Sequence, residues 1–192
     1  MSDKIYPVPK ISNLVPLMSE EKYSELYKLS LDNPNKFWGE EALSRLNWIK
    51  PFDDVLSTNM EEAEFEWFSN GKLNACFNCV DRHLENNGNK IAFIWESDDG
   101  STSKKITYQE LYEEVCRFSN LLKSRGIKKG DRVCIYMPMI LEAIYSMLAC
   151  ARIGAVHSVV FGGFSVESLK DRILDSDCQT IITANEGLRG GK

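Results

Sequence analysis

Two glycine pairs in the 192-residue sequence could bring the backbone close to an anionic ligand. The first is in the segment FGGFS at 161–165, where glycines can turn main-chain amides toward a ligand and a following helix N-terminus favours negative charge. The second is in RGGK at 189–192, where two cations flank a flexible pair and could contact phosphates. Spacing alone favours simpler roles, a tight turn for the first and a solvated loop for the second.

Neither glycine pair belongs to a standard nucleotide-binding fingerprint. In a Walker loop the first glycine stands six residues before the lysine, but Glu186 occupies that position relative to Lys192. The Ser or Thr that should follow the lysine is not in the sequence, and no G-x-G-x-x-G occurs. No carboxylate pair and no Ser/His/Asp set stands out from spacing either, so the sequence by itself predicts no catalytic group.

A third pattern, Cys76-x-x-Cys79-x-x-x-His83, places three potential zinc ligands on one predicted helical face. A structural zinc site needs four ligands, and no second Cys/His pair is near in the sequence. The same face is a continuous apolar stripe in which Cys acts as a small hydrophobic residue, so the pattern favours core packing and no metal site is predicted. A zinc-binding adaptor is the minority alternative, and metal analysis would test it. His157 is predicted to be a core histidine within a buried strand.

Hydrophobic periodicity predicts the elements that would position these residues. The N-terminal part contains two helices, followed by extended chain of poor periodicity, so residues 1–72 are expected to form a wrapping segment rather than an independent core. A further helix, a β-hairpin and a helix with the capping-box spacing Thr107 to Glu110 come next. The predicted ranges are helices 19–31, 34–46 and 74–87, strands 91–95 and 105–108, and a helix from 107 to 126.

The rest of the chain has the pattern βαβαβ. Its predicted ranges are strands 132–137, 155–161 and 179–184 with helices 141–153 and 166–175. This order predicts a parallel sheet with right-handed crossovers, and the nearly continuous apolar strands indicate helices on both faces. Ligands of such sheets bind at the carboxyl ends of the strands. Here those ends are the segments 137–139, 161–165 and 184–192, so both glycine pairs are expected at one edge.

Composition narrows the class of protein. The chain has 23 Lys+Arg and 28 Asp+Glu, a formal net charge of −5 and 43% hydrophobic residues, which is typical of a soluble globular protein and argues against nucleic-acid binding. No apolar run approaches the roughly 20 residues needed to cross a membrane, and the N-terminus does not resemble a signal peptide. A cytoplasmic or nucleocytoplasmic protein is expected, with its six cysteines reduced.

Several runs of the sequence resemble one known family. They are WFSNGKLNACFNCVDRHL (67–84), IAFIWESDDG (91–100), ITYQELYEEVCRFSNLLKSRGIKKGDRVCIYMPM (106–139), LACARIGAVHSVVFGGFSVESLKDRI (148–173) and ITANEGLRGGK (182–192). Together they closely resemble the N-terminal part of AMP-forming acetyl-coenzyme A synthetases, members of the adenylate-forming superfamily. The stretch 26–55 also resembles the extension that marks acetyl- and propionyl-type synthetases.

The resemblance implies an α/β fold in which the N-terminal helical and extended segment is followed by part of the doubly wound parallel sheet of the adenylate-forming large domain. It implies an extension over 1–72 and the start of the AMP-binding domain over 73–192. It also implies two steps: acetate attacks the α-phosphate of ATP to give acetyl-adenylate, and the thiol of coenzyme A then attacks the mixed anhydride. The implied coenzyme A contacts are Phe161, Gly162, Gly163, Arg189, Gly190, Gly191 and Lys192.

The family's ATP-phosphate loop, ribose-binding acid, acyl pocket and catalytic lysine have no counterpart in these 192 residues, and neither does a Mg²⁺ site. The resemblance therefore implies an incomplete enzyme, with acetate, ATP and coenzyme A as small-molecule partners, no catalytic residue in the chain and no ligase activity of the chain alone. A cut sheet edge would favour self-association. The alternatives are a propionate or other short-chain acyl-CoA synthetase fragment, and a short isoform acting as a non-catalytic binding module.

Overall fold

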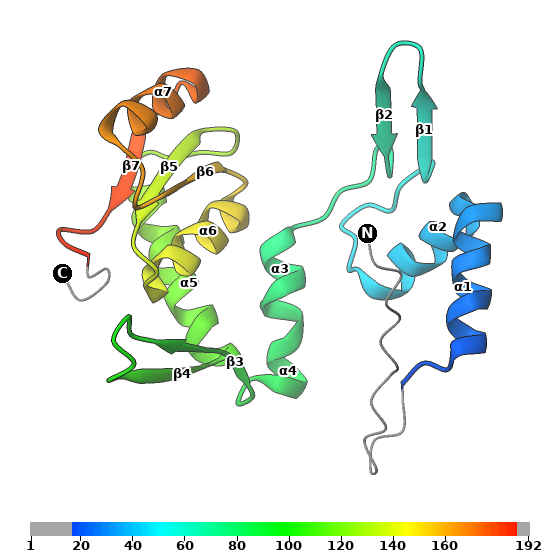
Figure 1. Ribbon diagram of the computed structural model, residues 1–192, viewed down its shortest axis with the longest axis horizontal. Coiled ribbons are helices and arrows are strands. Elements are labelled where there is room, and N and C mark those ends of the chain that lie inside the picture. The colour runs from blue at the N-terminus through cyan, green and yellow to red at the C-terminus, as the bar shows by residue number, and fades with distance from the viewer. Residues whose placement is uncertain (1–16, 188–192) are drawn as a thin grey trace, which may run out of the picture. The chain divides into compact units, whose positions relative to one another are not determined.

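The computed structural model describes residues 17–187, which divide into two compact units (Figure 1). The first unit contains the described residues up to Leu46 and the segment Phe52–Asn70. The second unit contains Asn47–Pro51 and the chain from Gly71 onward. No helix within residues 17–187 combines the length and the apolar character needed to cross a membrane.

The first unit begins with the two predicted helices, α1 (Glu20–Asp32) and α2 (Pro34–Arg45). The Ser19 hydroxyl accepts a hydrogen bond from the backbone N–H of Lys22 and caps α1. Asn33 ends α1 and caps α2, whose first residue is Pro34, a position where the missing N–H has no intrahelical partner to lose. Both helix predictions are confirmed.

The extended chain predicted up to residue 72 contains a hairpin that the periodicity analysis missed. Strands β1 (Leu56–Asn59) and β2 (Glu64–Trp67) pair antiparallel. The signal was present in β2, where Phe65 and Trp67 alternate with glutamates in the two-residue period of a strand. The turn between the strands has a positive φ of 54° at Ala63. Glycine or asparagine is the usual residue for this conformation, so an alanine gives no sequence signal for it.

In the second unit, the single helix predicted over 74–87 is broken. The chain forms α3 (Ala75–Cys79), a 3₁₀ turn (Asp81–His83) and α4 (Leu84–Asn87). The break is at Val80, which is fully buried and has non-helical dihedral angles (φ −126°, ψ −68°). The next turn tightens, since the His83 N–H bonds the Val80 carbonyl three residues back. Cys76 and Val80 are therefore core residues, whereas Cys79 is exposed.

The predicted hairpin and the long helix after it are confirmed. Strands β3 (Ile91–Glu96) and β4 (Ser103–Thr107) pair antiparallel, and α5 (Tyr108–Ser124) follows directly. Thr107 and Glu110 form the predicted capping box, in which each side chain accepts a hydrogen bond from the other residue's backbone N–H. Gly126, with a φ of 86°, directs the chain away from the end of α5.

The C-terminal half of the second unit is the predicted parallel sheet. Strands β5 (Arg132–Met137), β6 (Val156–Phe161) and β7 (Thr180–Thr183) lie in the order β6-β5-β7, and both pairings are parallel. The connections contain α6 (Leu141–Ile153) and α7 (Val166–Ser176).

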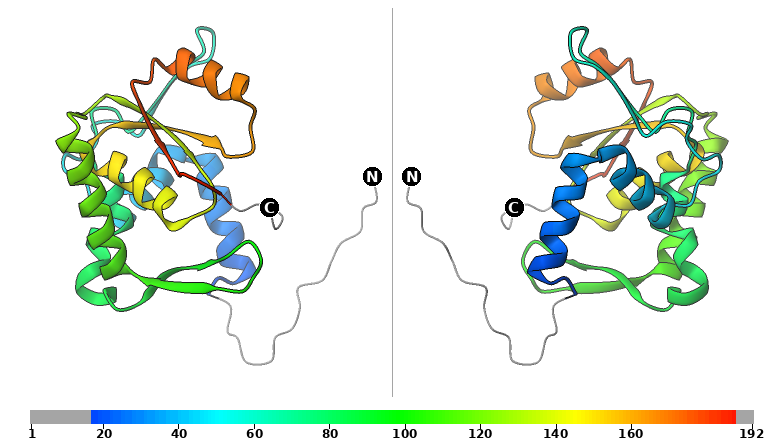
Figure 2. Two further views of the ribbon diagram at one scale, coloured as in Figure 1. Left: turned by 90° about the vertical axis from the view of Figure 1, so that its left-hand side faces the viewer. Right: turned by 90° about the vertical axis from the view of Figure 1, so that its right-hand side faces the viewer.

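Helices cover opposite faces of this sheet, as the turned views of Figure 2 show. Val133 and Ile135 of β5 pack in one buried cluster with residues of α5 and α6, whereas Cys134 belongs to another that α7 contacts. The sheet is therefore doubly wound, as predicted. The cover of β6 is incomplete, since Val156, Val159 and Phe161 are each about half exposed. His157 in the same strand is also exposed, so the prediction of a core histidine is wrong. The expectation that helices bury every apolar strand on both faces is therefore wrong for β6, because α6 and α7 both pack against this strand but leave these side chains partly uncovered.

Candidate functional site

The carboxyl ends of the three parallel strands meet around Pro138. The central strand β5 stops at Met137, because Pro138 has no N–H to continue the hydrogen-bond ladder. On one side, a Cβ atom at Gly162 would lie 3.0 Å from the Met137 carbonyl oxygen. On the other side, a Cβ atom at Gly187 would lie 3.2 Å from the Cβ of Pro138. The end of β6 and the segment after β7 therefore both touch the end of β5.

Gly162 has a packing role that does not depend on a ligand. The atoms nearest to the point that a Cβ would occupy all belong to the backbone of Met137 and Pro138, which cannot move aside as a flexible side chain could. A side chain at position 162 would require the backbone at the end of β5 to shift by a few tenths of an ångström. The tight-turn interpretation of the first glycine pair therefore holds for Gly162, and a ligand contact there would be an additional role.

The turn 161–165 connects β6 to α7 and is held from the sheet side by Tyr136. The phenolic hydroxyl of Tyr136 is 3.2 Å from the carbonyl oxygen of Gly162 and 3.2 Å from that of Phe164. Within the turn, the Phe164 N–H donates to the Phe161 carbonyl at 3.0 Å. Ser165 then caps α7 by accepting a hydrogen bond from the Ser168 N–H at 3.3 Å.

Aromatic rings and one cation cover the outside of this turn. The Phe161 and Phe164 rings meet edge to face with their centroids 5.8 Å apart, and Phe161 is half exposed. The Arg172 guanidinium lies over the Phe164 ring at 4.6 Å, within cation–π range, and donates to the Ser168 carbonyl. A positive charge thus lies beside the N-terminus of α7, the end of a helix that favours anions. Neither Tyr136 nor Arg172 was predicted as a site residue.

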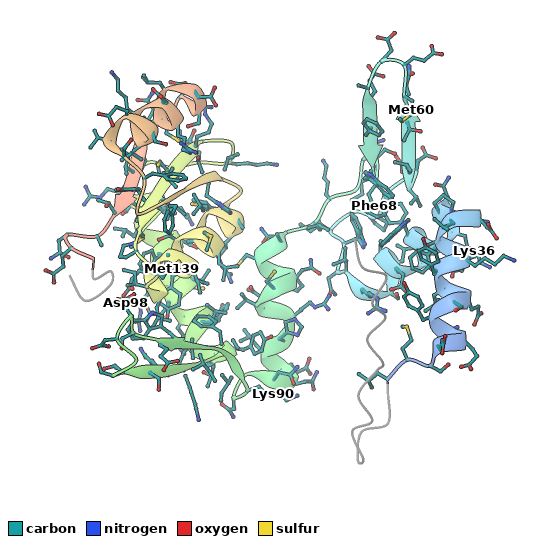
Figure 3. All side chains as sticks on the ribbon, viewed as in Figure 1. Lys36, Met60, Phe68, Lys90, Asp98 and Met139 are labelled. Carbon is teal, nitrogen blue, oxygen red and sulfur yellow. The ribbon has the colours of Figure 1, made fainter. Side chains whose placement is uncertain are left out.

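Acidic and aromatic groups also flank this edge. The pKa of Glu167, in the first turn of α7, is lowered by its own backbone N–H and by the Ser165 hydroxyl, so this carboxylate remains ionised at neutral pH. The indole N–H of Trp95 in β3 donates to the Met139 carbonyl at 2.8 Å and so ties the hairpin to the segment after β5. Figure 3 labels Met139, whose side chain is largely exposed.

The second glycine pair lies outside the described residues. Gly187 is the last described position, so Arg189, Gly190, Gly191 and Lys192 remain a sequence prediction. The zinc alternative finds no geometric support in the described part of the chain. Cys76 is buried, Cys79 is exposed, and the His83 ring packs on Tyr108 at a centroid distance of 5.1 Å. Residues 17–187 contain no group of three side chains positioned to hold a metal ion.

Two hollows of the second unit lie at the C-terminal end of α6, near the amino ends of the strands. One groove of about 460 Å³ is lined by Trp48, Asn74, Asp81 and Arg152, and another of about 510 Å³ lies between α5 and α6. Arg152 donates two hydrogen bonds to Asp81, and the Asn74 amide caps two carbonyls at the end of α6. These contacts join the start of α3 and the 3₁₀ turn after it to α6, so we assign this region a structural role and place the candidate site at the carboxyl edge.

Comparison with known proteins also divides the chain into two parts. A family model described as AMP-binding enzyme matches residues 80–190, and one described as Acetyl-coenzyme A synthetase N-terminus matches residues 23–79. The chain is 56% identical over 188 residues to acetyl-coenzyme A synthetase 2 of Pseudomonas aeruginosa, which covers 98% of this chain and 29% of that protein. It is 54% identical over 193 residues to the acetyl-coenzyme A synthetase of Alkalilimnicola ehrlichii, which covers 100% of this chain and 30% of that protein. The chain thus spans less than a third of the length of these curated relatives.

Proposed function

Because the chain belongs to the family of AMP-binding enzymes, we propose that it is the N-terminal part of an acetate:coenzyme A ligase. The observation that carries this proposal is the identity of 54–56% to the two acetyl-coenzyme A synthetases, which extends over nearly the whole chain. In the proposed reaction, an acetate oxygen attacks the α-phosphorus of ATP and pyrophosphate leaves. The thiol of coenzyme A then attacks the acetyl carbon, and AMP leaves with the electron pair of the broken C–O bond.

The proposed domains are an extension over 1–72 and the start of the AMP-binding domain over 73–192. Two observations support this division. The second compact unit, which also contains Asn47–Pro51, is continuous from Gly71 onward, and the two family matches meet between residues 79 and 80.

The proposed location is the cytoplasm. The six cysteines, all free, are in keeping with a cytoplasmic protein.

The proposed coenzyme A contacts are the turn residues Phe161, Gly162 and Gly163 together with Arg189, Gly190, Gly191 and Lys192. The position of the turn supports this assignment, because it lies at the carboxyl edge of a parallel sheet and precedes the N-terminus of α7. Phosphates of coenzyme A suit backbone amides there and arginine or lysine donors from the second loop. We assign the ATP phosphates and Mg²⁺ to the part of a family-length enzyme outside this chain, because the 192 residues contain no phosphate-binding fingerprint.

The test uses a synthetase of family length whose first 192 residues are this chain. We expect acetate-dependent exchange of pyrophosphate into ATP, and formation of acetyl-CoA when coenzyme A is added. Faster exchange with propionate than with acetate would shift the proposal to the propionate enzyme, and no exchange with either acid would overturn it.

The chain alone is proposed to be inactive and to self-associate. Strands β6 and β7 each pair only with β5 among the described residues, and β6 carries three half-exposed apolar side chains. Exchange by the purified 192-residue chain at the rate of a complete synthetase would contradict the proposed incompleteness. An inactive monomer in light scattering would remove the self-association proposal and favour a short binding module.

The coenzyme A assignment is tested by Arg189→Ala in the family-length enzyme. A charge-assisted hydrogen bond contributes about 1.5–3 kcal/mol, so the KM for coenzyme A should rise roughly 10- to 150-fold. Pyrophosphate exchange, which needs no coenzyme A, should keep its rate. Lys123→Ala, which removes an exposed cation near the end of α5, is the matched control. Equal loss of exchange in Arg189→Ala would show that Arg189 supports folding or ATP binding instead.

A further inference from the structure

We propose that Tyr136 is a positioning residue for coenzyme A, and that its hydroxyl sets the direction of the amides that meet a phosphate. The inference rests on the proposed function. The resemblance points to the turn residues Phe161, Gly162 and Gly163 but assigns no role to Tyr136, which belongs to the neighbouring strand β5. The hydroxyl of Tyr136 lies between two backbone carbonyl oxygens, which share its one proton.

The ring of Tyr136 is fixed by packing on the α7 face of the sheet. It lies against the buried cluster of Cys134, Val160 and Cys178, to which α7 contributes Leu169 and Ile173. A ring held in this way has few rotamers available, so its hydroxyl is presented at one place. That place is the inner side of the turn, 3.2 Å from the carbonyl oxygens of both Gly162 and Phe164.

Holding these carbonyls determines where two amides point. In a planar trans peptide, the C=O of one residue and the N–H of the next point in opposite directions. The structure contains no cis peptide bond among the described residues. With the Gly162 and Phe164 carbonyls directed at Tyr136, the N–H groups of Gly163 and Ser165 are directed away from the sheet. Both amides thus face outward beside the N-terminus of α7.

This arrangement suits a phosphate. Outward amides, the positive end of an 11-residue helix and the Arg172 guanidinium over Phe164 favour an anion beside this turn, and they act against the ionised Glu167 carboxylate in the first turn of α7. Without the hydroxyl, the two peptide planes could rotate, and a ligand would have to order them on binding. The cost would then appear in the affinity for coenzyme A and not in the chemistry of the first step.

The variant that isolates the hydroxyl is Tyr136→Phe, which keeps the ring and its packing. Its matched control is Tyr145→Phe, which removes a hydroxyl from a buried tyrosine of α6 outside the turn. Both are made in the family-length enzyme that begins with this chain. Loss of a hydrogen bond of ordinary strength predicts a KM for coenzyme A raised about three- to tenfold in Tyr136→Phe. The rate of acetate-dependent pyrophosphate exchange and the KM values for ATP and acetate should remain unchanged, and Tyr145→Phe should change none of these quantities.

An unchanged KM for coenzyme A in Tyr136→Phe would overturn the proposal, and so would an equal effect of Tyr145→Phe. Reduced pyrophosphate exchange in Tyr136→Phe would overturn it as well, since it would indicate a general structural role. If the parent enzyme shows no acetate-dependent exchange, the proposed reaction fails, but calorimetric titration with coenzyme A still decides the role of Tyr136. A dissociation constant for coenzyme A that is three- to tenfold larger in Tyr136→Phe supports the positioning role. Equal constants, or a parent enzyme that binds no coenzyme A, reject it.

Discussion

The two units of the chain differ in how far their apolar side chains are buried. In the second unit, three clusters of buried residues pack the helices α3, α5, α6 and α7 against the strands. In the described part of the first unit, Ala42 is the one apolar residue that reaches the same degree of burial. The first unit nevertheless contains well-formed helices with normal caps. Regular secondary structure and a buried core are therefore separable properties in this molecule.

The helices α1 and α5 show the difference most directly. Both have an apolar stripe at helical spacing. The stripe of α5, including Leu111, Val115 and Leu122, is at most 4% exposed. In α1, Tyr23, Tyr27 and Leu31 are 56–64% exposed. An amphipathic pattern thus states which face of a helix favours burial, but it does not state whether the same chain supplies the cover.

The largest expected effect is the difference in labelling rate between buried and exposed cysteines. All six cysteines belong to the second unit, so their thiols report on its core. Burial raises the pKa of the Cys76 and Cys150 thiols to about 11. At pH 8 only about one in a thousand of such thiols is ionised, and burial also blocks reagents, so both should react at least about 100-fold more slowly than the exposed Cys79. Labelling with a chromogenic disulfide, followed by peptide mapping, measures this difference.

The same thiols predict a pH dependence of stability. A thiol whose pKa is raised on folding holds its proton more tightly in the folded state, so its contribution is complete below the ordinary pKa of about 9 and is lost as the pH rises toward 11. The urea midpoint of Cys150 labelling should therefore fall between pH 9 and 11.

The labelling rates themselves can contradict the predicted burial. Labelling of Cys76 and Cys150 as fast as Cys79 in the native chain would show that the second unit lacks the core described above.

The next largest effect is expected for Ile135→Ala in the central strand β5. Ile135 is 1% exposed, and removing a buried aliphatic side chain of this size costs about 2–5 kcal/mol of unfolding free energy. Tyr27→Ala, at a half-exposed position of α1, should change the unfolding free energy of the second unit by less than about 0.5 kcal/mol. Urea unfolding followed by Cys150 labelling compares the two. Ile135→Val, at about 0.5–1.5 kcal/mol, serves if the alanine variant does not fold. Equal effects at positions 135 and 27 would remove the distinction between the units.

The parts of the fold that follow local rules could be predicted from the sequence. The alternation of apolar strands and helices gives the parallel sheet, and the spacing of Thr107 and Glu110 gives the start of α5. The break at Val80 could not be predicted, because it depends on which neighbours bury that side chain and not on the local pattern. The hairpin β1–β2 was missed because residues 60–63 contain no Gly, Pro or Asn, and the one turn signal is Asn59 before them, whose side chain accepts from the Glu61 and Glu62 N–H groups.

The candidate site was predictable to a similar extent. Topology places the end of β6 at the carboxyl edge, and the glycine pair marks it. Tyr136 could not be assigned, because its role depends on contacts between two strands that are distant in sequence. A partial signal exists, since Cys134 and Tyr136 are two residues apart and must share the face covered by α7. The sequence does not give the atoms of the turn that the Tyr136 hydroxyl reaches, because these contacts depend on the three-dimensional arrangement of the two strands.

A smaller effect is expected from the ion pair that joins the 3₁₀ turn after α3 to α6. Asp81 and Arg152 are 18% and 22% exposed, and two hydrogen bonds connect them. Asp81→Asn should lower the unfolding free energy of the second unit by about 1–3 kcal/mol, because the guanidinium loses its countercharge in a partly buried position. In the first unit, Glu25→Gln breaks a pair with Lys22 whose side chains are 69% and 54% exposed, so its effect should be about 0–0.5 kcal/mol.

A second variant separates the charge from the packing of this pair. The Arg152 Nε is buried and has no hydrogen-bond partner among the described residues, so the pair already carries an unsatisfied group. Adding Arg152→Met to Asp81→Asn removes the stranded cation and should restore part of the lost stability. Urea midpoints of the parent chain and the two variants measure this restoration. A double variant less stable than Asp81→Asn would show that the packing of the Arg152 stem, and not the charge, stabilises the contact.

The smallest effects are expected at two helix caps whose side-chain hydrogen bonds have the same length. The Thr107 hydroxyl accepts from the Glu110 N–H at 3.2 Å, and the Ser19 hydroxyl accepts from the Lys22 N–H at the same distance. Thr107→Ala should cost about 1 kcal/mol of the unfolding free energy of the second unit, because α5 cannot fray without exposing its buried stripe. The pKa of Glu110 is lowered by the Thr107 backbone N–H, so the carboxylate half of this box is complete above pH 4.5 and is lost as the pH falls through the lowered pKa. Ser19→Ala should reduce helical circular dichroism slightly and leave the midpoint of Cys150 labelling unchanged, because α1 buries no residue. An equal shift of that midpoint by Ser19→Ala would show that α1 is coupled to the core of the second unit, and the difference in burial between the two stripes would then not measure their difference in stability.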